Sequence, residues 1–168
     1  FEGDNERSGV LRWVTEQRVS PHPDHPGTAD LYDAVEQIVC DHKNLAPSSL
    51  DKIRKGGPVS TTTGKPTIGP RNYRVQLFLY GLGYIRLGLP VKKVAIAAYP
   101  RTASSLDGLY VRDEDFTSDG FTLLPEPAEL LAQVFEETKV RRAYADRIIA
   151  GEIALMDVPA TASEDGCY

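Results

Sequence analysis

Residues 27–43, GTADLYDAVEQIVCDHK, contain the two segments that decide the fold of this chain. TADLYDA (28–34) and QIVCDHK (37–43) each gather β-favouring residues in a short run, which is typical of a strand. Because only Val35 and Glu36 lie between them, we expect a tight hairpin with a two-residue connection. This hairpin is interpreted as part of a β-sheet.

The rest of the chain predicts three more strands and two helices around the hairpin. Strand segments alternate apolar and polar residues, whereas helical segments repeat apolar residues every three or four positions. The order of these segments predicts an α/β fold (α+β mixed), with a central mixed β-sheet flanked by helices. The expected elements are strands at 11–19, 91–99 and 108–113 and helices at 73–87 and 126–149.

Residues 44–72 show little periodicity. The stretch 45–57 (LAPSSLDKIRKGG) is expected to hold a helical turn or two, and the Gly-, Pro- and Thr-rich remainder a loop. Loops of this length are uncommon in compact domains and are usually functional or disordered. We therefore predict a basic loop insertion over 44–72.

The composition places the chain among ordinary globular domains. Hydrophobic residues make up 41% and charged residues 26% of the 168 residues, which excludes a disordered chain and a fibre. Cys40 and Cys167 are too few for a disulfide framework or a four-cysteine site, so no iron–sulfur cluster is expected. With neither a membrane-length apolar run nor a signal peptide, we expect one cytoplasmic domain over residues 1–168 and no membrane partner.

The net charge of −5 conceals a strong asymmetry. Residues 44–101 hold ten Lys and Arg against the single acid Asp51, a net charge of +9, while the rest of the chain carries −14. A basic stretch of this kind suits a phosphate-bearing partner, although a merely solvated basic face is the alternative.

Two carboxylates stand out on the predicted hairpin. Asp30 and Asp41 lie on its adjacent strands, where they can converge on one hard cation, and oxygen ligands favour Mg²⁺ or Mn²⁺ over zinc. Lys43 lies two residues beyond Asp41 and therefore on the same face of its strand. An ammonium in that place suits the stabilisation of charge on a phosphate. An ordinary surface hairpin with solvated charges is the alternative.

Two polar residues mark the first predicted helix. Gln76 and Tyr80 are four residues apart, so their polar ends share one helical face among apolar neighbours. The chain thus contains, in order, Gly27-x-x-Asp30, Asp41-x-Lys43, a long basic segment and Gln76-x-x-x-Tyr80. This series resembles the PD-(D/E)XK nuclease superfamily, in the branch that includes RecB nuclease domains, lambda-type exonuclease and CRISPR-associated exonucleases.

The resemblance extends over about residues 10–112. It is greatest to the small exonucleases of actinobacterial phages, which share phrases similar to SSLDKIRKGGP, YRVQLFLYGLG and VKKVAIAAYPR. It implies a restriction-endonuclease-like core. It also implies a domain shortened at its N-terminal helix, which often carries a histidine in relatives, and at its C-terminus, where many relatives have a four-cysteine iron–sulfur site.

The resemblance also implies roles for individual residues. Asp30 and Asp41 correspond to the family's metal-binding acids, the backbone carbonyl of His42 to a further metal ligand, and Lys43 to its catalytic lysine. Gln76 and Tyr80 correspond to the motif that supports the active site and contacts DNA. Glu16 stands where many members carry another acid, and it is either a metal ligand or a surface salt-bridge partner. The basic residues expected to bind DNA are Lys52, Arg54, Lys55, Lys65, Arg71 and Arg74.

The implied function is a Mg²⁺- or Mn²⁺-dependent deoxyribonuclease. We expect an exonuclease that hydrolyses phosphodiester bonds during phage or bacterial DNA recombination or processing, without sequence specificity. The alternatives are a DNA-binding or end-processing module with little or no turnover and a nuclease that acts on RNA. A homo-oligomer and a recombination partner protein stay open.

Three other motifs carry weaker signals. TTTGKPT (61–67) lacks the glycine spacing of a phosphate-binding loop. His22 and His25 are of metal-ligand type but lie in a proline-rich loop without a third partner. Cys40, on a presumed core strand, is interpreted as a small buried hydrophobic residue.

Overall fold

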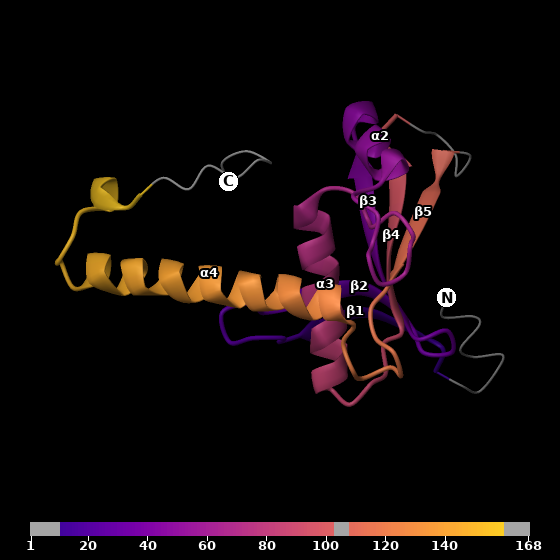
Figure 1. Cartoon of the computed structure of the whole chain (residues 1–168), viewed down its shortest axis with the longest axis horizontal. Coiled ribbons are helices and arrows are strands. Elements are labelled where there is room, and N and C mark those ends of the chain that lie inside the picture. Colours follow the sequence, from indigo (N-terminus) through magenta and orange to yellow (C-terminus); the bar gives the residue numbers. More distant parts are fainter. Residues whose placement is uncertain (1–10, 103–107, 160–168) are drawn as a thin grey trace.

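The computed structural model describes residues 11–102 and 108–159, which form a five-stranded mixed sheet (Figure 1). The strands lie side by side in chain order, with β3 and β4 parallel and every other neighbouring pair antiparallel. The mixed α/β class predicted from the sequence is confirmed. The strands are β1 (Trp13–Val19), β2 (Gly27–Asp33), β3 (Ile38–Leu45), β4 (Lys93–Pro100) and β5 (Tyr110–Asp115).

Three α-helices flank this sheet. They are α2 (Pro47–Lys55), α3 (Arg71–Arg86) and α4 (Pro125–Ile149), and a short 3₁₀ turn, η2 (Leu155–Asp157), follows α4. Figure 1 shows α3 running across one face of the sheet, with α2 beside the carboxyl ends of β3 and β4. In the described part of the chain, no helix is long and apolar enough to cross a membrane.

The core lies between α3 and the sheet. Leu77 and Phe78 of α3 are fully buried with Val94 and Ile96 of β4. Gly81 permits the close approach, because a Cβ there would lie 2.6 Å from the Phe116 ring. The helix that carries Gln76 and Tyr80 is thereby held firmly against the strands that carry the candidate acids.

The prediction of a two-residue hairpin was wrong, because the turn between β2 and β3 spans four residues, 34–37. Asp33 shapes it, since its Oδ1 accepts hydrogen bonds from the backbone N–H of Val35 (3.0 Å) and Glu36 (3.2 Å). Gln37 completes the turn with a φ of 60°. This side-chain-supported turn replaces the tighter one expected from the sequence.

The segment 44–72 is more ordered than the predicted loop. Its first part is the nine-residue helix α2, which begins at Pro47, ends at Lys55 and is capped by Gly56, whose φ is 78°. Its second part folds back on itself, with an isolated bridge between Val59 and Pro66. Leu50 and Ile53 bury the inner face of α2 in the core, so tertiary packing stabilises this short helix.

Candidate active site

Asp30 and Asp41 are brought together by the β2–β3 hairpin. The β2–β3 pairing ends at Leu31 and Cys40, and Asp30 and Asp41 are the next residues along the two strands. The two carboxylates are close enough for the Asp30 charge to raise the pKa of Asp41. The Asp30 Oδ2 accepts a 2.7 Å hydrogen bond from the backbone N–H of His42, which fixes this carboxylate beside β3.

Asp41 is the buried member of the pair, with only 2% of its surface exposed. Burial raises its pKa, the neighbouring Asp30 charge raises it further, and the ion pair with Lys43 opposes both effects. The Lys43 Nζ lies 2.8 Å from the Asp41 Oδ2. Two acids therefore lie near one another, with the Lys43 ammonium against Asp41 and the His42 ring 4.0 Å from Asp30.

Gln76 and Tyr80 connect α3 to this acid pair. The Gln76 Nε2 donates to the Asp41 Oδ1 at 3.3 Å and to the Tyr80 hydroxyl at 2.8 Å. A continuous polar chain thus runs from Tyr80 through Gln76 and Asp41 to Lys43. The structure brings together four residues that the sequence analysis assigned to one site from two separate segments.

Gly27 has a role that the sequence did not reveal beyond its place in the Gly-x-x-Asp motif. A Cβ at this position would lie 2.9 Å from the Tyr80 Cε1, closer than such atoms normally approach. The missing side chain makes room for the Tyr80 ring. The sequence signal for this role is that Gly27 precedes Asp30 by three residues on the same short strand.

The next two residues are His42 and Glu16, which the sequence analysis named as further metal ligands. The backbone N–H of His42 donates to Asp30, its ring Nδ1 lies 4.0 Å from the Asp30 Oδ2, and its ring lies 6.2 Å from the Tyr99 ring. Glu16 is exposed on β1 and has a φ of 52°, and the β1–β2 pairing passes from Thr15–Leu31 to Gln17–Ala29 without including Glu16. Within residues 11–102 and 108–159, no group of three or more His, Cys, Asp or Glu side chains is arranged to hold a metal ion.

The basic residues expected to bind DNA fall into three groups, of which Arg74 alone forms the third. Lys52, Arg54 and Lys55 are exposed on α2, close in sequence to Lys43. Lys65 and Arg71 are exposed but form ion pairs, with Asp115 at 3.5 Å and with Glu137 at 2.9 Å.

Arg74, by contrast, is engaged inside the protein. Its side chain is only 17% exposed, and its Nε donates to the buried Glu114 at 2.7 Å. Its Nη2 also lies 3.4 Å from Glu126. Glu126 in turn accepts hydrogen bonds from Thr61, so Arg74 helps to fix the 57–68 segment onto α4. The structure therefore gives Arg74 an internal role in place of the expected DNA contact.

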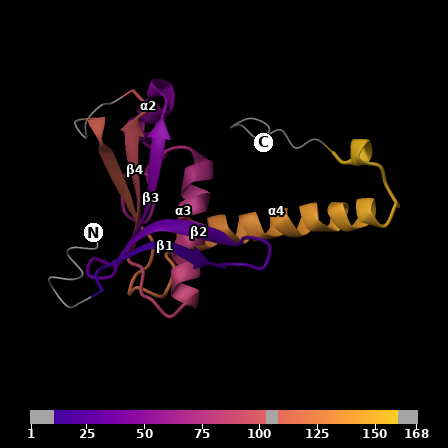
Figure 2. The same cartoon turned by 180° about the vertical axis from the view of Figure 1, so that it is seen from behind.

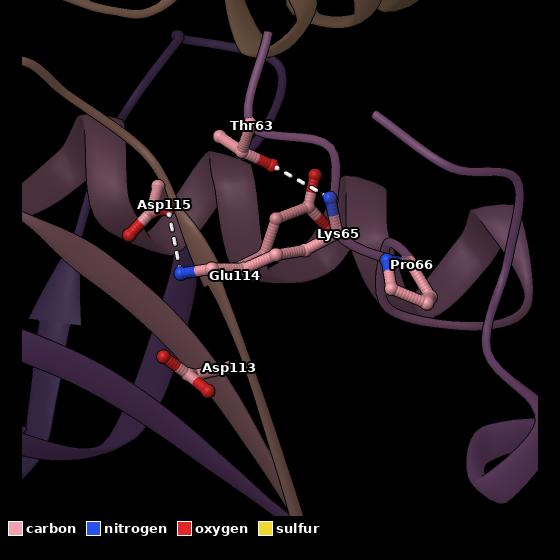
Figure 3. A pocket seen from close by; sticks show the side chains of 6 residues that line it. All are labelled: Thr63, Lys65, Pro66, Asp113, Glu114 and Asp115. Carbon is pink, nitrogen blue, oxygen red and sulfur yellow. Dashed lines mark hydrogen bonds and ion pairs between the residues drawn. The ribbon is translucent and has the colours of Figure 1, made fainter. Parts of the chain in front are cut away.

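The pocket in Figure 3 lies apart from the acid pair and includes none of its residues. Lys65 reaches across it to Asp115 at 3.5 Å, and its backbone N–H donates to Thr63. Its acids are therefore held by neighbouring cations, since Lys93 also pairs with Asp113 at 2.6 Å. The pocket is lined by Thr63, Lys65, Pro66, Asp113, Glu114 and Asp115.

His22, His25 and Cys40 have structural surroundings. The His22 ring stacks on Phe135 with centroids 5.0 Å apart, and His25 Nε2 lies 2.7 Å from the Thr138 hydroxyl. These contacts attach the β1–β2 loop to α4. Cys40 is half-buried on β3, not fully buried as expected. Partial burial, assisted by the charges of Asp41 and Asp30, raises the pKa of its thiol to about 11, which suits an unreactive residue. Cys167 lies outside the described residues.

Comparisons with known proteins returned no matching family model, curated protein or solved structure. The functional interpretation therefore depends on the geometry of the acid pair and on the resemblance of its sequence motifs.

Proposed function

We propose that this protein is a metal-dependent DNA nuclease whose active site is formed by Asp30, Asp41 and Lys43, with Gln76 and Tyr80 in support. The observation that carries the proposal is the polar chain from Tyr80 through Gln76 to Asp41 and Lys43. This arrangement offers two carboxylates that could hold a divalent cation and an ammonium that could stabilise the charge developing on a phosphodiester, with an amide to orient Asp41.

The donor set suits a hard divalent cation. Asp30 and Asp41 offer oxygen ligands only, which Mg²⁺ and Mn²⁺ prefer. The raised pKa of Asp41 reflects burial and a second acid nearby, and a dication would relieve both effects. When bound, such an ion would polarise the phosphodiester and lower the pKa of an attacking water molecule.

The protein's own groups orient this site. Gln76 holds the Asp41 Oδ1, and Tyr80 fixes the direction of the Gln76 amide. The backbone N–H of His42 holds Asp30. The Lys43 ammonium, 22% exposed at its side chain, can donate to a phosphate oxygen and offset the negative charge that develops there.

The surface charge favours a nucleic acid as the substrate. Lys52, Arg54 and Lys55 follow Lys43 on the next element of the chain, and among them only Arg54 has an acidic partner in the described part, the exposed Asp51. Cations of this kind bind the phosphate backbone without reading sequence.

The decisive experiment incubates the chain with linear single- and double-stranded DNA in Mg²⁺, in Mn²⁺ and in EDTA. We expect the chain to cleave DNA in Mg²⁺ or Mn²⁺ and not in EDTA. Lys43→Ala and Asp41→Asn should each reduce the cleavage rate about 100-fold or more. The matched control is Lys92→Ala, which removes an exposed lysine ahead of β4 and should leave cleavage unchanged.

Three results would contradict the proposal. A folded wild-type chain that retards DNA in a gel but cleaves nothing would be a binding module. Preferential cleavage of RNA would identify a ribonuclease. Full activity in Lys43→Ala would place the chemistry elsewhere in the chain.

A further inference from the structure

Arg101 is the first residue after β4, and it is attached to the end of β3 by two hydrogen bonds. Its backbone N–H donates to the Leu45 carbonyl at 2.9 Å, and its side-chain Nε donates to the Asn44 carbonyl at 3.3 Å. Asn44 directly follows Lys43 on β3. The guanidinium is therefore held on the strand that also carries Asp41 and Lys43 of the candidate site.

The directions of the backbone groups place this guanidinium on the β2 side of β3. In a strand, the N–H and C=O of one residue point to the same side, and those of the next residue point to the opposite side. The Leu45 carbonyl points towards β4, since it accepts from Arg101, so the Asn44 carbonyl points away from β4. The N–H of His42 points in the same direction as the Asn44 carbonyl, because it donates to Asp30 of β2 at 2.7 Å. The Arg101 side chain thus starts beside β4 and ends on the side where Asp30 lies.

The separation of β2 from β3 leaves room for this contact. The β2–β3 pairing ends at Leu31 and Cys40, while β3 and β4 stay paired up to Leu45. Figure 2 shows β2 bending away from β3, whereas β3 and β4 continue side by side. His42 and Asn44 are two residues apart, which is about 6.6 Å along a strand. The Arg101 guanidinium therefore lies about one nucleotide-sized step along β3 from the backbone group that holds Asp30.

The guanidinium keeps its charge and most of its hydrogen-bond donors available. Arg101 is exposed, and among the described residues it has no acidic partner. Its Nε is used on the Asn44 carbonyl, so the two Nη groups remain as a fork of the kind that binds a phosphate in bidentate form. Other cations of the same basic stretch are neutralised by acids, namely Lys65, Arg71, Arg74 and Lys93.

We infer that Arg101 is a substrate-binding residue that holds a backbone phosphate of the nucleic-acid strand next to the phosphodiester at Lys43. The inference deepens the proposed function and rests on it for the identity of the ligand. The contact is to the backbone, so it positions the strand without reading its sequence. An arginine that only closes the end of β3 is the structural alternative, and the experiment below separates the two roles.

A thermodynamic cycle between Arg101 and single phosphates tests the inference. The probes are variants of the shortest single-stranded oligonucleotide that binds, each with one uncharged methylphosphonate linkage at a different position. Fluorescence anisotropy in EDTA measures their binding to the wild-type and Arg101→Ala chains without cleavage. Arg101→Ala should weaken binding of the unmodified strand about tenfold. One or two linkage positions should cause a similar loss in the wild type and no further loss in Arg101→Ala.

Arg86→Ala is the matched control, because it removes an exposed arginine from the last turn of α3 and changes the net charge equally. It should leave the affinity within about twofold of the wild type and leave the methylphosphonate profile unchanged. In the cleavage assay, Arg101→Ala should raise KM about tenfold with kcat within about twofold, because the contact is made equally in the ground state and the transition state. Thermal unfolding checks that the variant is folded.

The inference is overturned if Arg101→Ala binds as tightly as the wild type. It is equally overturned if every methylphosphonate position lowers the affinity of both chains by the same factor, since a residue that only closes β3 has no coupling to one phosphate. The binding cycle does not depend on turnover. Coupling in a chain that cleaves nothing would contradict the proposed nuclease and support the role of Arg101, whereas cleavage without coupling would do the reverse.

Discussion

At the scale of single residues, Gly27 and Tyr80 have complementary shapes at the candidate site. The ring occupies space that any Cβ at position 27 would restrict. Since the same ring holds the Gln76 amide through its hydroxyl, the glycine affects Asp41 only through Tyr80 and Gln76.

We expect Gly27→Ala to destabilise the protein by about 1–3 kcal/mol, because it overpacks this contact. In a Tyr80→Ala background the same substitution should cost much less, so a double-mutant cycle by urea unfolding should give a coupling energy above about 0.5 kcal/mol. Additive effects would mean that the two residues do not press on each other.

Asp33 predicts a pH dependence of stability. Burial raises its pKa, but hydrogen bonds from Arg12 and from the backbone N–H of Glu36 and Val35 outweigh burial and leave the pKa lowered. The folded state therefore favours the ionised form. This stabilisation is complete above the pKa of an unfolded Asp, ~3.9, and is lost as the pH falls through the lower folded value.

Asp33→Asn should cost about 1.5 kcal/mol at neutral pH and flatten the acid limb of the free energy of unfolding, measured by urea titration at a series of pH values. Asp51→Asn is the control, since this side chain is 61% exposed and its ion pair is 3.7 Å long. An unchanged acid limb in Asp33→Asn would contradict the assignment.

At the scale of elements, the segment after α2 is tied down from two directions. Arg112 of β5 donates to the Ile53 and Arg54 carbonyls at the end of α2, where a cation satisfies the last free acceptors of a helix. Glu126 of α4 accepts from Thr61. These contacts hold a glycine-rich stretch that has few apolar residues of its own.

Arg74→Ala should therefore destabilise the protein by about 3–5 kcal/mol, because it leaves the buried Glu114 without its cation. Arg71→Ala removes the half-exposed pair with Glu137 and should cost less than about 1 kcal/mol. Thermal unfolding of the two variants measures the difference. If both variants lost the same small amount of stability, the internal role of Arg74 would be contradicted and Arg74 would again be a candidate DNA contact.

The sequence predicted elements whose signal is local and missed those that depend on distant partners. The spacing of apolar residues predicted helix α3. The position of Asp30 and Asp41 on adjacent predicted strands indicated that the two acids lie near each other. The internal role of Arg74 did not, because Glu114 lies 40 residues away along the chain. The turn length depended on the Asp33 carboxylate and on the positive φ of Gln37, which strand propensity does not encode.

At the scale of the whole molecule, the basic charge of residues 44–101 is reduced by internal pairing. Lys65, Arg71, Arg74 and Lys93 all form ion pairs with acids of the body or of α4. Summing charge along the sequence therefore overstated the surface available to a polyanion. Lys52 and Lys55 at the exposed end of α2 are among the described cations of this stretch that stay outside such pairs.

We expect Lys52→Ala and Lys55→Ala each to weaken DNA binding equally for unrelated sequences. The logarithm of the DNA association constant falls linearly with the logarithm of the salt concentration. Each variant should make this slope less steep by about one, the amount lost with one phosphate contact. Fluorescence anisotropy over a salt series measures this, with Lys92→Ala as the control. An unaltered slope in both variants would show that α2 is not the DNA-binding surface.

The order of the strands has a consequence for how the site is assembled during folding. The two acids belong to one short hairpin, which closes quickly because little chain entropy is lost, whereas Gln76 reaches Asp41 across 35 positions. We therefore expect the acids to meet early and the amide to join them only when α3 docks. Recovery of activity during refolding would then report the arrival of that helix, after most of the secondary-structure signal has returned.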